Sequence, residues 1–337
     1  MNLSIGIVGL PNVGKSTLFK AITKQQVNIA NYPFATIDPN VGVVVVPDER
    51  LEKLAKLSNS KKIVPAVVEF YDIAGLVKGA YKGEGLGNQF LSHIRDVNAI
   101  VQVVRCFPSS EIIHVEQGVD PVRDLEIVNM ELILKDLDTA ERRLKKLEGE
   151  AKTDKQKQKD FEAIKKVVEI LEKNILASNV GEEILDMPVV KETNLLTIKK
   201  QIYLLNGKPE DVSEELKNKI KSLNSDYLIV DLGDEGNETG LSELIKKAYG
   251  VLDLISFLTT GEDETRAWTI EKGAKAPQAA GVIHTDFEKN FIRAEVINWQ
   301  KLLEASGWTQ AKQKGWLRLE GKEYVVQDGD VMEIRHG

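Results

Sequence analysis

A nine-residue segment near the start of the chain carries the residues best suited to chemistry. Gly9-Leu-Pro-Asn-Val-Gly14-Lys15-Ser16-Thr17 fits the pattern G-x-x-x-x-G-K-[ST] in full. In this pattern backbone N–H groups converge on phosphate oxygens, the lysine reaches the β- and γ-phosphates, and the serine hydroxyl can ligate Mg²⁺. The segment predicts a nucleoside triphosphate site whose first wall is formed by Asn12, Val13, Gly14, Lys15, Ser16 and Thr17.

A second motif, D-x-x-G, follows at Asp72-Ile-Ala-Gly75. At this distance from the first motif, a GTPase-like site places its second magnesium-side carboxylate and a glycine that senses the γ-phosphate. Asp72 would hold Mg²⁺ through water. Between the two motifs, Thr36 is the natural candidate for a threonine that closes over the metal when triphosphate is bound. We therefore expect the metal ligands to be Ser16, Thr36 and Asp72.

Two departures from the Ras-like pattern concern the water and the base. Leu76 stands where a glutamine would orient the attacking water, so the water must be positioned by another group. There is no N-K-x-D motif; a predicted strand instead ends in Asn206-Gly207-Lys208-Pro209. Proline cannot accept hydrogen bonds from guanine N1 and N2, which undermines guanine specificity. The amide of Asn206, with backbone groups near Gly207, could still meet an adenine edge.

Short apolar runs along the chain predict the strands that position these residues. They are rich in β-branched residues and separated by helix-length segments, which is typical of parallel strands joined by crossover helices. The runs are Leu3 to Val8, Val67 to Tyr71, Ala99 to Val104, Ile202 to Leu205 and Tyr227 to Val230. The first phosphate motif follows the first run and precedes a helical segment. The sequence therefore predicts an α/β fold.

An insertion of different character spans residues 122–195. Apolar residues recur there at spacings of three and four, once from Met130 to Leu147 and again from Phe161 to Ile175. This period predicts two amphipathic helices in an antiparallel hairpin arm. Between Arg142 and Lys166 there are ten Lys/Arg against five Asp/Glu. Two interpretations stay open: a solvated helix face, or a surface that faces RNA phosphates.

The chain closes with a small mixed domain, which we place at 253–337, after a G domain at 1–252 that the arm interrupts. Pro277 starts a short helix, and Phe291 to Val296 alternates as a strand. Tyr324 to Val326 and Val331 to Ile334 bracket Asp328-Gly329, which predicts a β-hairpin.

Composition excludes several classes of protein. With 337 residues, 42% of them hydrophobic and 29% charged, the chain is an ordinary globular protein of two or three domains. The net charge of −7 argues against a broad nucleic-acid-coating surface, and the single cysteine excludes an internal disulfide or a multi-cysteine metal site. No apolar run approaches membrane-spanning length. We expect a cytoplasmic protein with neither DNA nor a membrane as partner.

Across essentially its whole length the sequence resembles the Obg-like ATPases of the YchF subfamily. The resemblance rests on GLPNVGKST (Gly9 to Thr17), NYPFATIDPN (Asn31 to Asn40), the 29-residue run that begins DIAGLVKG (Asp72 to Ile100), and the run that begins RAWTIEKG (Arg266 to Ile297). It implies a P-loop NTPase fold: an OBG-type G domain with an inserted α-helical coiled-coil arm and a C-terminal β-grasp TGS domain. It also implies a Mg²⁺-dependent ATPase that acts as a switch, binds the ribosome through rRNA and ribosomal proteins, and modulates translation or a stress response.

The resemblance assigns further residues. In this family a loop histidine replaces the missing glutamine, and CFPSSEIIHV (Cys106 to Val115) matches that loop, which makes His114 the candidate. Together with Lys15 and Gly75 of the two phosphate motifs, His114 would form the catalytic set. Asn12 matches a position that binds K⁺ in relatives without the glutamine; its other possible role is to stabilise the loop. The family usually shows N-x-x-E, whereas Pro209 occupies the acidic position here and Glu210 follows it. Two alternatives therefore remain: an Obg-type GTPase, or a ribosome- or RNA-binding scaffold with a structural nucleotide.

Overall fold

The computed structural model describes residues 4–24, 40–73, 94–108, 118–151, 154–234 and 238–337, which form two compact units. The first unit comprises 1–43 and 69–241, and the second comprises 44–68 and 242–337. Within the described residues, no helix has both the length and the apolar character needed to cross a membrane.

The first unit is built on a six-stranded sheet in the order β2-β4-β1-β5-β6-β7. β1 pairs in parallel with β4 and β5, and β5-β6 and β6-β7 are also parallel, as the sequence predicted. All residues of β1 and β5 are buried, which fits strands covered on both faces. The strands are β1 (Ser4–Val8), β2 (Val41–Val45), β4 (Val67–Asp72), β5 (Ala99–Arg105), β6 (Lys200–Asn206) and β7 (Asp226–Val230).

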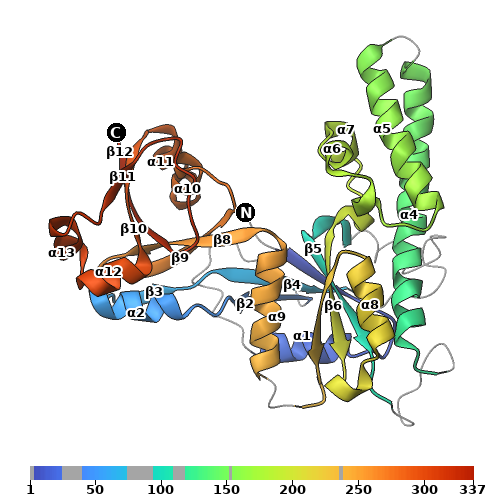
Figure 1. Ribbon diagram of the computed structural model, residues 1–337, viewed down its shortest axis with the longest axis horizontal. Helices are drawn as coiled ribbons and strands as arrows, with labels where there is room; N and C mark the ends of the chain where they lie inside the picture. The colour runs from blue at the N-terminus through green and yellow to red at the C-terminus, as the bar shows by residue number, and fades with distance from the viewer. Residues whose placement is uncertain (1–3, 25–39, 74–93, 109–117, 152–153, 235–237) are drawn as a thin grey trace. The chain divides into compact units, whose positions relative to one another are not determined.

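Helices flank this sheet and follow the strands that carry the predicted site (Figure 1). α1 (Lys15–Thr23) starts directly after the glycine loop and buries Leu18 and Ile22. α8 (Glu214–Ser222) follows β6 and the short 3₁₀ turn η5 (Pro209–Asp211), and its Leu216 and Ile220 pack in one cluster with residues of β5 and β6. α9 (Glu238–Val251) follows β7 in the chain, and from Ser242 onward it belongs to the second unit.

The insertion forms the predicted helical arm. Figure 1 shows α4 (Pro121–Glu150) and α5 (Lys155–Glu172) side by side, extending away from the sheet of the first unit. Each helix begins at an aspartate whose side chain accepts from a backbone N–H of the first turn: Asp120 from Arg123, and Asp154 from Gln156. The predicted apolar seam is buried between the helices at Ile133, Ala140, Leu147, Ile164, Val168 and Leu171.

Short helical turns complete the arm and lead back to β6. They are η3 (Ala177–Asn179), α6 (Glu182–Leu185), α7 (Pro188–Lys191) and η4 (Leu196–Ile198). Asp136 of α4 fixes this return: it is fully buried and accepts hydrogen bonds from Leu196 N, Thr197 N and Thr197 Oγ1 at 2.8, 2.7 and 2.6 Å. The carboxylate therefore holds the chain at the base of the arm, where it re-enters the sheet.

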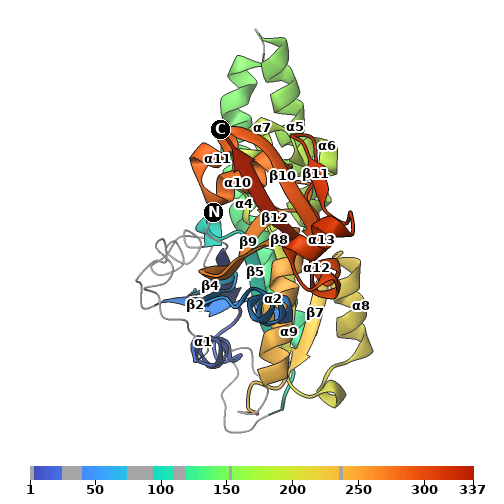
Figure 2. The same cartoon turned by 90° about the vertical axis from the view of Figure 1, so that its left-hand side faces the viewer.

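The second unit contains a six-stranded sheet in the order β11-β10-β12-β8-β9-β3. β8 and β9 form an antiparallel hairpin, β12 lies between β8 and β10, and Figure 2 shows β10, β11 and β12 side by side. Apart from β3, this is the strand order of a β-grasp module. The elements are β8 (Leu254–Thr260), β9 (Glu264–Glu271), α10 (Ala276–Ile283), α11 (Thr285–Lys289), β10 (Phe291–Asn298), α12 (Trp299–Ala305), α13 (Trp308–Gln313), β11 (Arg318–Glu320) and β12 (Asp330–His336).

The expected hairpin around Asp328-Gly329 is wrong. The turn is present, with Gly329 at φ +82°, and β12 begins at Asp330. Val325, however, forms an isolated bridge with Lys275, and β12 pairs with β10 and β8 instead of with the preceding residues. A turn signal reports local backbone geometry only, so it could not identify the partner strand.

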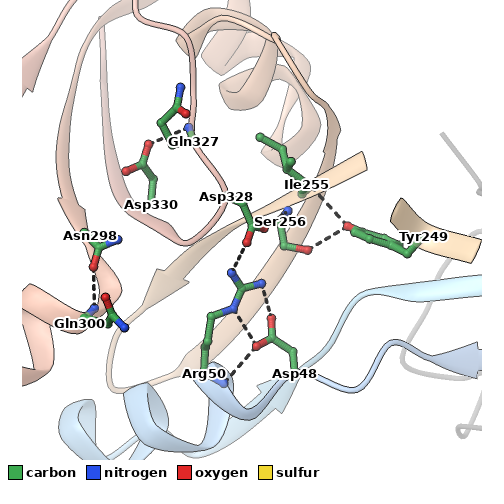
Figure 3. Close-up of polar contacts among 10 residues, drawn as sticks. All are labelled: Asp48, Arg50, Tyr249, Ile255, Ser256, Asn298, Gln300, Gln327, Asp328 and Asp330. Atoms are coloured by element: carbon green, nitrogen blue, oxygen red, sulfur yellow. Dashed lines mark hydrogen bonds and ion pairs between the residues drawn. The ribbon is translucent and has the colours of Figure 1, made fainter. Parts of the chain in front are cut away.

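The segment from Val44 to Val68 belongs to the second unit, although the sequence analysis placed it within the G domain. It contains α2 (Glu49–Ser58) and β3 (Lys62–Val64), and β3 pairs in parallel with β9. Figure 3 shows how Arg50 fastens the segment: its guanidinium contacts both Asp48 oxygens at 2.8 Å and Asp328 Oδ2 at 2.7 Å. The observed division therefore differs from a single boundary at 252/253, because pairing of this edge strand depends on residues distant in sequence.

Candidate nucleotide-binding site

The glycine loop runs from the end of β1 to the start of α1, and close contacts explain its glycines. Gly9 has φ +150°, and a Cβ there would lie 2.6 Å from the Val103 oxygen. Gly14 has φ +107°, and a Cβ there would lie 2.5 Å from Asn206 Nδ2. Neither position has room for a side chain, so the loop's backbone can pass close to β5 and β6 only because these residues are glycines.

Lys15 lies at the first turn of α1 and is only 8% exposed. Its Nζ donates to the Leu10 oxygen at 2.7 Å. Burial lowers the pKa of Lys15 to about 8, and the carboxylate of Asp72 opposes this shift. The ammonium is thus a partly desolvated cation inside the loop, which is the environment in which an anionic phosphate interacts most strongly with it.

Asp72 ends β4 opposite Ile7 of β1, and it is close enough to Lys15 for each charge to influence the other's pKa. Burial raises the pKa of Asp72, and Lys15 opposes that effect. Ser16 is exposed and lines the same cavity as Lys15. The structure therefore brings the loop and the D-x-x-G aspartate into one site, as predicted.

Asn206 connects the glycine loop to the ends of two other strands. It is 3% exposed; its Nδ2 donates to the Val13 oxygen at 2.9 Å, and its Oδ1 accepts from Leu232 N at 3.1 Å. Next to it, Gly207 N donates to the Val230 oxygen at 3.2 Å. These bonds hold the loops after β1, β6 and β7 together.

A cavity of about 460 Å³ lies where these loops meet. Its lining residues are Asn12, Gly14, Lys15, Ser16, Thr17, Phe107, Asn206, Asp231, Leu232 and Gly233. Asn12 has a left-handed backbone, with φ +62°. Two predicted nucleotide-binding residues lie beside the cavity without lining it: the Val13 side chain is buried in the core, and Gly207 packs against Cys106. Their contribution to binding stays a prediction.

Four lining residues were absent from the predicted site: Phe107, Asp231, Leu232 and Gly233. Phe107 follows β5, and its position is fixed by buried Arg105, whose Nε donates to the Phe107 oxygen at 3.2 Å while Cζ lies 4.5 Å from the ring centroid. The other three follow β7. Ligands of parallel α/β sheets bind outside the carboxyl ends of the strands, so the residues that directly follow each predicted strand could have been added on that ground.

Three predicted residues lie outside the described residues: Thr36, Gly75 and His114. Leu76 also lies outside them. Within the part of the chain that the structure does describe, there is no cluster of three or more His, Cys, Asp or Glu residues of the kind that binds a metal on its own.

Comparison with known proteins gives full-length relatives. The chain is 48% identical over 368 aligned residues to the ribosome-binding ATPase YchF of Bacillus subtilis strain 168, covering 99% of both chains. It is 44% identical to the protein of that name from Haemophilus influenzae and 43% identical to that from Escherichia coli O157:H7, again covering 99% of each chain. Among solved structures, the YchF GTPase of Schizosaccharomyces pombe matches with a TM-score of 0.84 and 41% identity, over 99% of this chain and 98% of that one.

Family models agree with these relatives. Residues 4–135 match a family described as 50S ribosome-binding GTPase. Residues 254–337 match the YchF GTPase C-terminal family, described as a protein of unknown function (DUF933). The glycine loop and Asp72 fall within the first match, and the β-grasp strands fall within the second. From its P-loop site and from full-length similarity well above 30% identity, the chain belongs to the YchF family of P-loop NTPases.

Proposed function

We propose that this chain is a Mg²⁺-dependent ATPase that acts as a nucleotide-controlled switch on the ribosome. One observation carries the enzymatic part: the glycine loop, Lys15 and Asn206 line a single cavity of about 460 Å³, within the size range of small-molecule sites. The names of the relatives, which describe ribosome-binding ATPases, support both parts of the proposal.

The donor set fits magnesium. The residues near Lys15 offer oxygen ligands, the Ser16 hydroxyl and the Asp72 carboxylate, and Mg²⁺ prefers oxygen ligands, waters and substrate phosphates. When bound, the ion would neutralise charge on the phosphates. Thr36 would complete the set. K⁺ at Asn12 is a further part of the proposal, supported by the position of Asn12 in the cavity wall.

The chain's own groups would divide the remaining work. The amides of the glycine loop and the Lys15 ammonium would hold the phosphates, and the N–H of Gly75 would respond to the γ-phosphate. His114 would orient the attacking water, since Leu76 has no hydrogen-bonding group. The nucleotide state would thereby control the loops around Thr36 and Gly75, and the arm and the C-terminal unit would report it to the ribosome in the cytoplasm.

Phosphate release by the purified chain tests the enzymatic part. We expect slow hydrolysis of ATP, faster than that of GTP, and loss of nucleotide binding in Lys15→Ala. His114→Ala should lower turnover and leave nucleotide affinity unchanged. Preferential use of GTP would instead establish the Obg-type GTPase. Failure of the wild-type chain to bind either nucleotide in the presence of Mg²⁺ would refute the proposal.

Co-sedimentation with ribosomes tests the second part. Lys145, Lys146 and Lys155 are exposed near the arm's tip, and reversing all three to Glu should abolish association if cations there meet rRNA phosphates. The matched control reverses exposed Lys301, Lys312 and Lys322 of the second unit, with the same change in net charge. Equal effects of the two triple variants would refute a specific role for the arm. If association with ribosomes is the same with and without nucleotide, and is unchanged in Lys15→Ala, the ribosome-binding scaffold would be favoured.

A further inference from the structure

One carboxylate, that of Asp231, lines the same cavity as the residues of the glycine loop. Asp231 follows β7 directly and shares the cavity wall with Asn206. Its Oδ1 accepts from Gly233 N at 2.9 Å, which orients the carboxylate across its own turn. Among the residues described, none forms an ion pair with Asp231, so its second oxygen remains available to a ligand.

Asn206 has one donor left on the same wall. An amide nitrogen carries two hydrogens. One bonds the Val13 oxygen, and Oδ1 is engaged by Leu232 N. The second hydrogen of Nδ2 can therefore donate to a base, while the two existing bonds fix the plane of the amide.

A fixed donor beside a carboxylate distinguishes the two purines. On the edge that carries N7, adenine presents the acceptor N7 next to the amino donor N6, whereas guanine presents two acceptors, N7 and O6. An ionised carboxylate can only accept. We propose that Asp231 is the residue that selects adenine: Asn206 donates to N7, and Asp231 accepts from the N6 amino group. With guanine, O6 would face the carboxylate oxygen, which leaves two acceptors opposed.

Glu210 does not compete for this role. It is exposed within η5 and does not line the cavity. Its neighbour Asp211 is engaged in the same turn, where Oδ2 accepts from Lys208 N at 2.9 Å. The acidic group in the cavity wall thus comes from the loop after β7 and not from the loop after β6.

The proposal rests on the proposed function, and binding of non-hydrolysable nucleotide analogues tests it. The wild-type chain should bind the ATP analogue at least about tenfold more tightly than the GTP analogue, as one well-placed hydrogen bond allows. In Asp231→Ala the preference should fall below about threefold, mainly through weaker ATP binding. Asp231→Asn, which can still accept from Gly233 N and can donate to O6, should strengthen GTP binding. The matched control, Glu210→Gln, should leave the preference unchanged.

A probe nucleotide gives the same test without a mutation. Purine riboside triphosphate lacks the N6 amino group, so the wild-type chain should bind it about as weakly as Asp231→Ala binds ATP, and the variant should not distinguish it from ATP. Equal binding of the probe and ATP by the wild type would overturn the proposal, as would an unchanged preference in a folded Asp231→Ala. Absence of all nucleotide binding by the wild type would refute the proposed function itself.

Discussion

The side-chain nitrogen of Asn206 lies 2.9 Å from the main-chain oxygen of Val13, and this bond joins positions 193 residues apart in the chain. The side-chain oxygen of Asn206 accepts a hydrogen bond from Leu232 N. A single amide therefore connects the glycine loop to the loops that follow β6 and β7. The shape of the cavity depends on it before any nucleotide binds.

Replacing this amide should weaken both the fold and the site. Asn206→Ala would leave the Val13 oxygen and Leu232 N without their buried partner, at a cost of about 1–3 kcal/mol for each group. We expect unfolding at lower urea concentration and weaker ATP binding. Asn179→Ala, at an exposed site with one local bond, is the control. Unchanged unfolding of Asn206→Ala would show that the bond contributes nothing.

Gly14→Ala should abolish nucleotide binding. The new Cβ would lie 2.5 Å from Asn206 Nδ2, so either the loop or the amide must move. Gly273→Ala is a matched control because Gly273 also has a positive φ, +95°, but nothing lies within 4 Å of its added Cβ. It should show only the backbone cost of about 1 kcal/mol. Isothermal titration with ATP and thermal unfolding separate the two effects; equal losses in both variants would exclude the clash.

Cys106 should resist alkylation in the folded protein. Burial, with the charges of Asp211 and Asp124, raises the pKa of its thiol to about 12, so only about one molecule in ten thousand carries the reactive thiolate at pH 8. Intact-mass measurement should show no iodoacetamide adduct at pH 8 under native conditions and one adduct after denaturation, because the chain has a single cysteine. Rapid native labelling would mean that the end of β5 opens to solvent.

The buried carboxyl of Asp136 should make the free energy of unfolding fall as pH rises from about 4 to 6. Burial raises the pKa of its carboxyl from the ordinary 3.8 to about 6, and the hydrogen bonds from Thr197 and Leu196 oppose this rise. Between these values the folded state binds more protons than the unfolded state, so this residue's contribution to stability is present at low pH and is lost as pH rises.

The comparison with Asp136→Asn isolates this effect. The free energy of unfolding of the wild type, relative to the variant, should drop by about 3 kcal/mol at most between pH 4 and pH 7. The variant is expected to be less stable overall, since an amide cannot accept from both Leu196 N and Thr197 N through two oxygens. A difference independent of pH would show that the carboxyl does not titrate in this range.

Removal of the metal should reproduce the effect of losing the Ser16 hydroxyl. We expect a chelator to abolish ATP hydrolysis and to weaken ATP binding, and Ser16→Ala to bind ATP equally weakly with or without Mg²⁺. Thr17→Ala, one residue further along the same cavity wall, should keep its response to Mg²⁺. A Ser16→Ala variant with a full magnesium response would transfer the ligand role to another group.

The local parts of the site could be predicted from the sequence because the chemistry there depends on adjacent residues. The glycine loop, its strand and helix, and Asp72 at the end of a strand all follow from short patterns, and the structure places them together. Asp231 belongs to no such motif: only its place directly after a predicted strand pointed to it, and its position in the cavity depends on β7 pairing with β6.

Long-range pairing also accounts for the errors in the fold. The seam of the arm was predictable, because both helices repeat a period that each displays on its own. The partner of β12 was not, since Asp328-Gly329 specifies only a turn. Nothing in Lys62–Val64 indicates that this strand would pair with β9, some two hundred residues later.

Because β3 and α2 are encoded so far upstream, the β-grasp module cannot be cut out at one point of the gene. A fragment of residues 253–337 would lack the strand that covers the outer edge of β9 and the arginine that binds Asp328. Such an unprotected edge favours self-association. Transplanting the module into another protein would therefore require a second piece, residues 44–68, supplied in trans or fused by a linker.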